Sequence, residues 1–246
     1  MPTFQTLQDR VTRRVIDLPA SVTAEVPDLI NKAMRTLQEM HNFKVMETEQ
    51  KLLTTTVATH PLSAAVPANF KEFRGLPYLV KNDGSTRDLL LAANRNAVLD
   101  VFPLNDPNDT GEPKLVLDPE PADDQNTRTL EVWPFPDGLS DYTGGEYRIT
   151  IPHWRYVAAL NGGTDENWFT SNAEWYLVFQ ATAEAFYLDW DEARGQLWEV
   201  RAGDFAPDGR AVGEFKRVMK QDKLAKLAGV RQLAVSLDVF GPQIRS

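Results

Sequence analysis

The stretch EWYLVFQATAEAFYLDWDEARGQLWEV, residues 174–200, decides the fold class, because it combines helical periodicity with a high density of aromatic rings. At about 100° per residue, its first six rings fall within one third of the helix circumference. These rings belong to Trp175, Tyr176, Phe179, Phe186, Tyr187 and Trp190. Periodic aromatic residues usually indicate burial, so we expect this face to pack against neighbouring helices.

A narrower second apolar face of the same helix holds Leu177, Ala181 and Leu188. A helix with apolar residues on two sides lies either deep in a bundle or with one face against another subunit. These three residues are therefore the candidates for a subunit interface. A membrane span is excluded, because four acids would be stranded in lipid. They are Glu184, Asp189, Asp191 and Glu192.

The sequence also indicates where this helix begins and ends. Ser171 and Glu174 have the S-x-x-E spacing of a capping box, so the helix is expected to begin there. It should run to about Val200, with a bend near Gly195.

Two helices are expected to open the chain. The first carries an apolar repeat over residues 4–18, with Thr3 as its cap. The second lies within residues 26–43 and has Pro27 in its first turn, a position that suits proline.

A last helix is expected in residues 213–230, where Gly229 is well placed to terminate it. The remaining residues, 231–246, are expected to form an extended tail.

Residues 44–157 have the features of strands, namely β-branched residues, alternation and turn residues. Strands are expected in KLLTTTV, FKEFRGLPYLV, KLVLD, RTLEVW and YRITI, with NDGS as a turn and a short helix around NRNAVLDVF. In the last strand Tyr147, Ile149 and Ile151 alternate with Arg148 and Thr150, which is typical of a sheet with one buried face. An antiparallel sheet or a small barrel is expected.

The predicted fold class is therefore α+β. Residues 1–43 and 158–230 should pack together as one helical bundle, because they flank the insertion. An antiparallel β domain is inserted at 44–157, and residues 231–246 form the extended tail.

Charge is distributed unevenly along the chain, whose net charge is -9. The stretch Asp100–Gly145 holds two basic residues, Lys114 and Arg128, whereas Lys216–Arg231 holds six against one acid, Asp222. An acidic protein is a poor general binder of nucleic acid or anionic lipid. The segregation indicates either solvated surface or complementary contact between copies in an oligomer. The acids of the first stretch are Asp100, Asp106, Asp109, Glu112, Asp118, Glu120, Asp123, Asp124, Glu131, Asp137 and Asp141.

The sequence offers no residue set that supports catalysis. There is no cysteine, which excludes disulfides and thiolate sites. His41, His60 and His153 each lack a carboxylate or second histidine at a metal-ligand spacing, and His153 in PHWRY is interpreted as structural. No phosphate-binding loop or nucleophile motif occurs. We expect no enzyme activity, no metal and no cofactor.

Two acidic motifs partly match the sequence patterns of known functional sites. Residues 106–117 begin like a calcium loop, but Leu117 stands where a bidentate Glu is needed, so a plain acidic turn is expected. In DWDE, Asp189 and Asp191 would project about 200° apart on a helix and could not converge on one substrate. The residues that match the calcium loop are Asp106, Asn108, Thr110 and Gly111.

The opening residues contain no apolar run of the signal-peptide type, and no later run approaches the length of a membrane span. Synthesis and residence in a cytoplasm are therefore expected.

The order of these segments resembles the head-tail adaptor (connector) proteins of tailed bacteriophages. The N-terminal helices carry LINKAMRTLQEMHNFKVMETEQKL, and the extended VPANFKEFRGL follows. A strand then closes on the proline-rich turn of LEVWPFPDG, and the helix rich in aromatics and alanine comes after it. The resemblance covers most of the chain in order.

The resemblance implies a ring, commonly of twelve subunits, that docks beneath the portal of the virion and lets DNA pass without specific binding. The bundle would build the ring, and the partners would be the portal protein, a tail, stopper or nozzle protein and further copies, with no membrane. The protein would be assembled in the host cytoplasm and reside at the head-tail interface. Its C-terminal segment would dock on the portal through Leu233, Val239, Phe240 and Ile244. The β insertion is larger than in the shorter adaptors, and its role stays open.

Two other functions stay open. A non-catalytic binding module of a phage tail or surface protein would recognise glycan or protein through residues 44–157. A hydrolase would use acids of the insertion such as Asp106 and Asp109.

Overall fold

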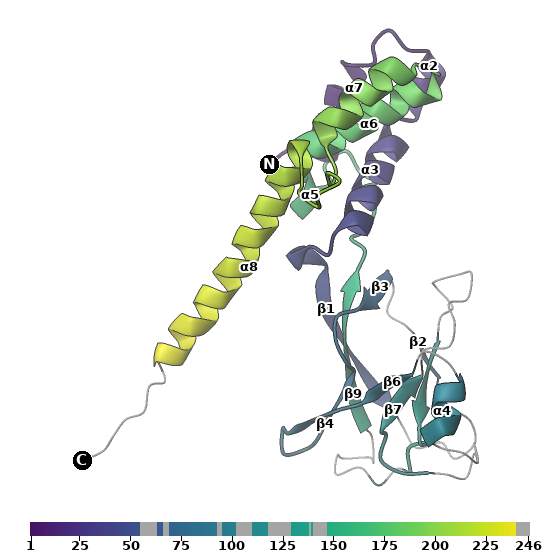
Figure 1. Cartoon of the computed structure of the whole chain (residues 1–246), viewed down its shortest axis with the longest axis vertical. Coiled ribbons are helices and arrows are strands. Elements are labelled where there is room, and N and C mark those ends of the chain that lie inside the picture. The colour runs from purple at the N-terminus through teal and green to yellow at the C-terminus, as the bar shows by residue number, and fades with distance from the viewer. Residues whose placement is uncertain are drawn as a thin grey trace. The chain divides into compact units, whose positions relative to one another are not determined.

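The chain divides into two units that differ in secondary structure (Figure 1). The helical unit comprises Met1–Val45 and Ala158–Ser246, and the β unit comprises Met46–Val157. The protein is therefore a mixed α+β chain, as predicted. The computed structural model describes residues 1–54, 63–65, 69–92, 95–101, 110–117, 129–137, 139 and 147–239.

The N-terminal part of the helical unit follows the sequence pattern closely. The side chain of Thr3 accepts a hydrogen bond from the main-chain nitrogen of Thr6 at 3.3 Å, which caps α1 as predicted. Pro27 lies in the first turn of α3. A short helix that was not predicted, α2, lies between them. The helices of this part are α1 (Phe4–Thr12), α2 (Ala20–Ala24) and α3 (Val26–Met40).

The predicted aromatic helix is divided into three. A capping box of Asn167 and Thr170 opens α5, so the box expected at Ser171 and Glu174 was wrong. The main helix, α6, contacts each of the other described helices of the unit. It is apolar nearly all round because it lies at the centre. The helices of the C-terminal part are α5 (Trp168–Asn172), α6 (Glu174–Leu188), α7 (Glu192–Ala202) and α8 (Gly213–Val239).

The chain reverses between α6 and α7, where a single bent helix was expected. Trp190 adopts a left-handed conformation with φ 61°, and the next N–H donates to the carbonyl of Phe186 at 2.9 Å, which ends α6. Asp191 then caps α7 by accepting from the main-chain nitrogen of Arg194 at 3.0 Å. Gly195 allows the two helices to approach, since a Cβ there would lie 2.4 Å from the Tyr187 ring.

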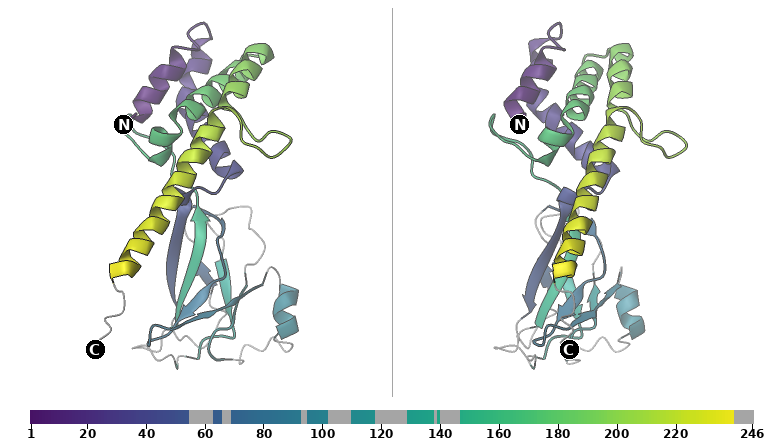
Figure 2. Two further views of the ribbon diagram at one scale, coloured as in Figure 1. Left: turned by 60° about the vertical axis from the view of Figure 1, so that its left-hand side comes forward. Right: turned by 90° about the vertical axis from the view of Figure 1, so that its left-hand side faces the viewer.

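The C-terminal helix, α8, is longer than predicted. Gly229 does not end it, and the helix continues to Val239, so the expectation of an extended tail from residue 231 was wrong up to that point. A glycine inside a helix costs about 1 kcal/mol, and good helix formers on either side offset this cost. In Figure 2 the helix extends away from the other helices of its unit. Residues 240–246 lie outside the described part of the chain.

The β unit contains two sheets, and its described strands do not close into a barrel. One sheet has the order β1-β9-β4-β5 with β3 also paired to β9, and the other has the order β2-β8-β7-β6. The described pairings are antiparallel except that of β6 with β7, which is parallel. The elements of the unit are η1 (Lys44–Met46), which leads into it, β1 (Glu47–Thr54), β2 (Ser63–Ala65), β3 (Phe70–Phe73), β4 (Tyr78–Val80), β5 (Thr86–Asp88), β6 (Leu90–Ala92), α4 (Arg95–Val101), β7 (Leu115–Leu117), β8 (Thr129–Trp133) and β9 (Tyr147–Arg155).

Strand β9 organises the first sheet. It pairs with β1 from Glu47 opposite Trp154 to Thr54 opposite Tyr147, and its other edge pairs with β3 and β4. Thr150 is buried, so the expectation that one face of this strand would be solvated was wrong at that position. Both sheets contribute to the core, which contains Phe70, Leu79, Leu89, Val116, Leu130, Val132, Tyr147, Ile149 and Ile151.

Candidate functional site

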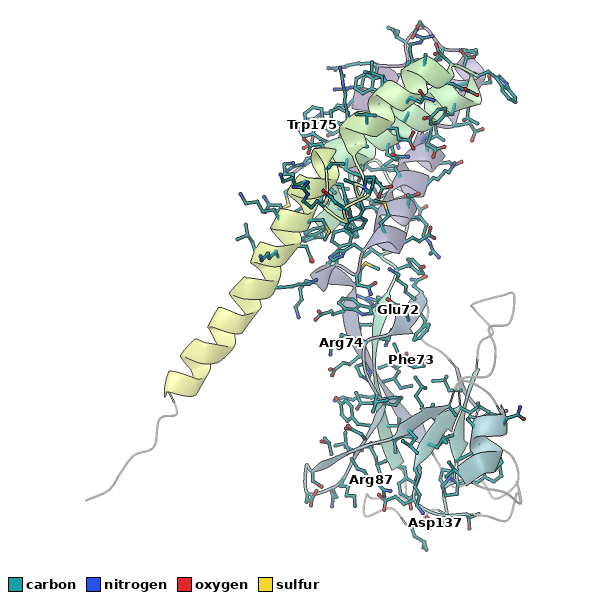
Figure 3. The ribbon with its side chains drawn as sticks, viewed as in Figure 1. Glu72, Phe73, Arg74, Arg87, Asp137 and Trp175 are labelled. Atoms are coloured by element: carbon teal, nitrogen blue, oxygen red, sulfur yellow. The ribbon has the colours of Figure 1, made fainter. Side chains whose placement is uncertain are left out.

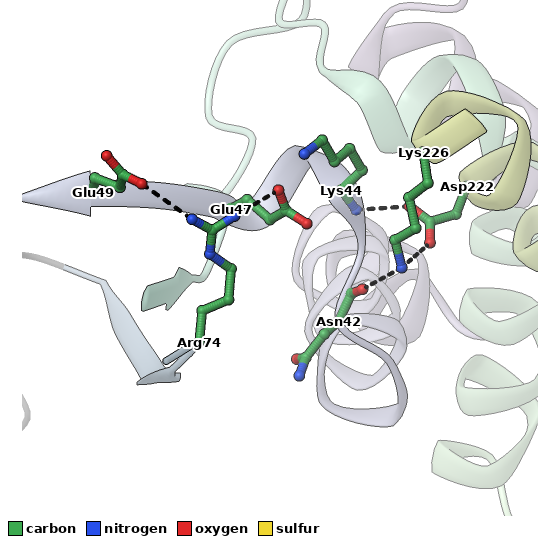
Figure 4. Close-up of polar contacts among 7 residues, drawn as sticks. All are labelled: Asn42, Lys44, Glu47, Glu49, Arg74, Asp222 and Lys226. Carbon is green, nitrogen blue, oxygen red and sulfur yellow. Dashed lines mark hydrogen bonds and ion pairs between the residues drawn. The ribbon is translucent and has the colours of Figure 1, made fainter. Parts of the chain in front are cut away.

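Asp222 is a buried carboxylate on α8 that fastens this helix to the residues following α3 (Figure 4). Its Oδ1 accepts a hydrogen bond from the main-chain nitrogen of Lys44 at 2.6 Å. Its Oδ2 lies 3.0 Å from Nε2 of His41 and 2.8 Å from Nζ of Lys226. Lys226 also donates to the main-chain oxygen of Asn42 at 3.2 Å. We name this group the Asp222 anchor.

The partners of Asp222 also determine its charge. Burial opposes ionisation, but the hydrogen bonds from His41, Lys226 and Lys44 outweigh it and hold the pKa of Asp222 below its ordinary value. The carboxylate is therefore ionised at neutral pH, with both oxygens occupied. This arrangement suits a structural fastening rather than proton transfer.

Three aromatic rings and three arginines form a second group, which we name the arginine–aromatic cluster. The guanidinium carbon of Arg14 lies 5.5 Å from the ring centroid of Trp175 and 5.7 Å from that of Trp198. Arg10 lies 4.9 Å from the Trp175 ring, and Arg201 lies 4.5 Å from the Trp198 ring. Trp175 is labelled in Figure 3. The cluster consists of Arg10 from α1, Arg14 from the turn that follows α1, Trp175 and Phe179 from α6, and Trp198 and Arg201 from α7.

The arginine–aromatic cluster carries unbalanced positive charge. Arg10 pairs with Glu174, but no carboxylate of the described residues pairs with Arg14 or Arg201. Burial, and repulsion by Arg10 and Arg201, lower the pKa of Arg14. Trp175 and Phe179 were recognised in the sequence, whereas Trp198 and the arginines that cover these rings were not.

Helix α7 exposes apolar residues on the side opposite its buried Gly195. Ala193, Leu197 and Val200 follow one another at spacings of four and three residues, so they form one stripe along the helix. Leu197 is 53% exposed and Val200 is 75% exposed. We name these three residues the α7 stripe. Such contiguous exposed apolar residues mark interaction sites.

The predicted interface residues on α6 separate into two groups. Leu177 and Ala181 are completely buried inside the helical unit, so neither can contact another subunit and that assignment was wrong for both. The reason is that α6 is covered on several sides by the other helices. Leu188 is 51% exposed and remains a candidate, and Trp190 beside it is 90% exposed.

The predicted portal-docking residues fall at the end of the chain. Leu233 and Val239 belong to α8, which is helical where an extended tail was expected. Phe240 and Ile244 lie outside the described residues.

In the β unit, Arg74 bridges two carboxylates of β1. Its guanidinium nitrogens lie 3.1 Å from Glu47 and 3.1 Å from Glu49 (Figures 3 and 4). Arg74 follows β3, and both β1 and β3 pair with β9, so this ion pair joins strands on either side of β9. Its role is to brace the sheet.

A small cavity of about 110 Å³ lies near one end of the first sheet. The hydroxyl of Tyr147 donates to Asp137 at 2.6 Å, and Glu112 lies 3.1 Å from Arg87 and 3.6 Å from Lys81. These contacts occupy the carboxylates of Asp137 and Glu112, and the described residues give no arrangement of nucleophile and base. The cavity is lined by Leu79, Val80, Lys81, Asn82, Glu112, Leu139 and Tyr147.

His153 is a buried residue of β9, in line with its predicted structural role. It is 1% exposed, stacks on Phe70 at 5.4 Å, and its Nδ1 lies 3.0 Å from the carbonyl oxygen of Ile151. Its Nε2 is buried and has no hydrogen-bond partner among the described residues. Burial lowers the pKa of His153, although the bond to Ile151 opposes this effect. The imidazole is therefore neutral at pH 7.

The acidic motifs of the sequence are only partly described. Asp189 and Asp191 end α6 and begin α7 respectively, so they do not share the continuous helix assumed for them. Among the residues that the structure describes, no group of His, Asp and Glu side chains could hold a metal ion. No helix in the described part is long and apolar enough to cross a membrane. Asp106, Asn108, Asp109 and His60 lie outside it.

No protein-family model matches this chain, and no curated protein matches it either.

One signal in the sequence could have revealed the Asp222 anchor. Asp222 is the single acid in the basic run 216–231, and Lys226 follows it by four residues on the same helix face. A lone acid on the buried side of a basic helix indicates a partner elsewhere in the fold. Its partners His41 and Lys44 are too distant in the chain to be found by spacing.

Proposed function

We propose that this protein is a structural head-tail adaptor of a tailed bacteriophage. In this role its copies form a ring, commonly of twelve, beneath the portal and join it to a tail, stopper or nozzle protein. DNA passes through the ring without specific binding. The protein assembles in the host cytoplasm and resides in the virion, and its work requires no catalysis.

One observation carries this proposal: the two ends of the chain build one helical unit, and the β unit is inserted between α3 and α5. Because α6 contacts helices from both ends, we infer that they act as one bundle. A rigid bundle suits side-by-side packing in a ring. In this arrangement the bundle forms the ring, and the β unit and α8 are free to contact other proteins.

The α7 stripe and the neighbouring residues Leu188 and Trp190 support contact between copies. They are exposed apolar residues on consecutive segments of the helical unit, and burying them would stabilise an assembly by roughly 25 cal/mol per Å² of apolar surface. In a ring, this surface would meet a different surface of the next copy, as heterologous contacts require.

Helix α8 and the residues after it are the proposed portal-docking segment. Leu233 and Val239 lie on the helix, and Phe240 and Ile244 follow it. The Asp222 anchor supports this role. It fixes α8 near its middle and so sets the direction in which this helix extends from the other helices of its unit. A docking segment that starts from a fixed direction loses less conformational entropy on binding.

Co-sedimentation with assembled portal tests the proposal. We expect the full chain to sediment with the portal and a chain ending at Gln232, which lacks all four proposed docking residues, to lose most of this binding while the rest of its helical unit stays folded. Equal binding by the shortened chain would remove the docking assignment. Absence of binding by the full chain would contradict the adaptor function.

A further inference from the structure

The arginine–aromatic cluster has more positive charge than its own unit neutralises. Arg14 donates to the main-chain oxygen of Arg10 at 2.6 Å, and Arg201 lies against the Trp198 ring, but neither has a carboxylate partner among the described residues. Like charges held together in a partly buried site repel one another more strongly than they would in water. An incoming anion would relieve this repulsion.

The geometry disfavours nucleic acid as that anion. Binding of single strands depends on bases that stack on aromatic side chains, and here Arg10, Arg14 and Arg201 already lie over the Trp rings. The net charge of -9 also opposes attraction of a phosphate backbone. Guanidinium groups bind carboxylates through paired, charge-assisted hydrogen bonds, so an acidic protein segment fits the cluster better.

The chain itself carries a segment of this chemistry. DPEPADD, residues 118–124, contains four carboxylates and no basic residue. Pro119 and Pro121 restrict its backbone, so less conformational entropy is lost when it binds. The segment is therefore complementary in charge to the cluster.

We propose that the arginine–aromatic cluster of one copy binds the acidic segment 118–124 of a second copy. This inference rests on the proposed ring, which places copies side by side, and it names one contact between them. Charge pairing through Arg14 and Arg201 then orients neighbours, while the apolar residues of α7 supply contact area. Complementary charge fixes the register of an interface more than it raises the affinity.

Fluorescence anisotropy with the intact protein and a labelled peptide of residues 117–127 tests this contact without requiring a ring. We expect saturable binding that weakens with salt, and binding at least about tenfold weaker for Arg201→Ala and for Arg14→Ala, the loss expected of a charge-assisted pair. Arg14→Lys checks that any loss does not come from misfolding, since it keeps the charge. Arg13→Ala is the matched control, because Arg13 is exposed and lies outside the cluster.

The outcomes are distinct. Binding that is lost with Arg201→Ala and kept with Arg13→Ala supports the contact, provided that a peptide with Asn and Gln in place of its acids does not bind. Failure of the acidic peptide to bind overturns it, as does an oligonucleotide of thymidines that binds in its place. Ring formation is scored separately by electron microscopy of the same samples. A ring without peptide binding therefore overturns this contact alone, and peptide binding without a ring overturns the adaptor function alone.

Discussion

The carboxylate of Asp222 lies 2.6 Å from the main-chain nitrogen of Lys44, although the two residues are 178 positions apart in the chain. This hydrogen bond fixes the C-terminal helix to the segment that leads out of α3. The charge of Lys226 and the ring of His41 complete the site. The direction of α8, and with it the proposed docking segment, thus depends on one buried acid.

Replacing that acid should destabilise the helical unit. Asp222→Ala removes a buried carboxylate that accepts from the Lys44 N–H and pairs with Lys226, and we expect a loss of about 3 kcal/mol in the free energy of unfolding. Urea unfolding followed by circular dichroism measures it. Asp208→Ala removes an exposed carboxylate paired with Arg210 and should leave the free energy of unfolding nearly unchanged.

The same acid has a signature in the pH dependence of stability. Because the folded-state pKa of Asp222 lies below the ordinary value of 3.8, its contribution to stability is present above about pH 4 and is lost as the pH falls through the lowered value. The difference in the free energy of unfolding between Asp222→Ala and the wild type should therefore be largest near neutral pH and smallest near pH 2. An equal difference at both pH values would contradict the assigned ionisation.

His153 should make the β unit less stable in mild acid. Its folded-state pKa lies below the ordinary value of 6.5, so the unfolded chain binds the proton more readily and stability falls as the pH drops below 6.5. The free energy of unfolding should fall by at most about 1.4 kcal/mol per pH unit. Unfolding of the full chain between pH 7.5 and 5 measures it, with His153→Phe as the comparison that should lack this slope. If the substitution left the slope of stability against pH unchanged, another titrating group would be its cause.

Acidic substitutions should have different effects on the exposed α7 stripe and on the buried face of α6. The double change Leu197→Asp and Val200→Asp places acids on the exposed α7 stripe and should abolish ring formation while leaving the melting temperature within a few degrees. Leu177→Asp places an acid in the core and should cost at least about 3 kcal/mol. Light scattering and thermal unfolding separate the two effects. Rings formed by the α7 double variant would remove the stripe from the interface.

Local sequence signals predicted much of the secondary structure. Thr3 caps α1, Pro27 opens α3, and Ile149 and Ile151 are buried on β9, because each of these features depends on residues close in the chain. Such signals act through hydrogen bonds or periodicity over a few positions.

The features that were missed depend on distant contacts. The chain reversal at Trp190 was not predicted, because a left-handed conformation is usually signalled by glycine. Gly195 was interpreted as a bend, whereas the Tyr187 ring of the adjacent helix explains it. Arg14 lies over the Trp198 ring and so connects the turn after α1 to α7, and no spacing rule connects residues so far apart. The candidate surfaces therefore became visible only in the folded chain.

The most direct test of the adaptor function is electron microscopy of the purified full chain, imaged alone and with its portal. We expect class averages to show a rotationally symmetric ring with a central opening, seated coaxially on the portal where both are present. A protein that remains a single copy at all concentrations and leaves the portal bare would contradict the proposed function.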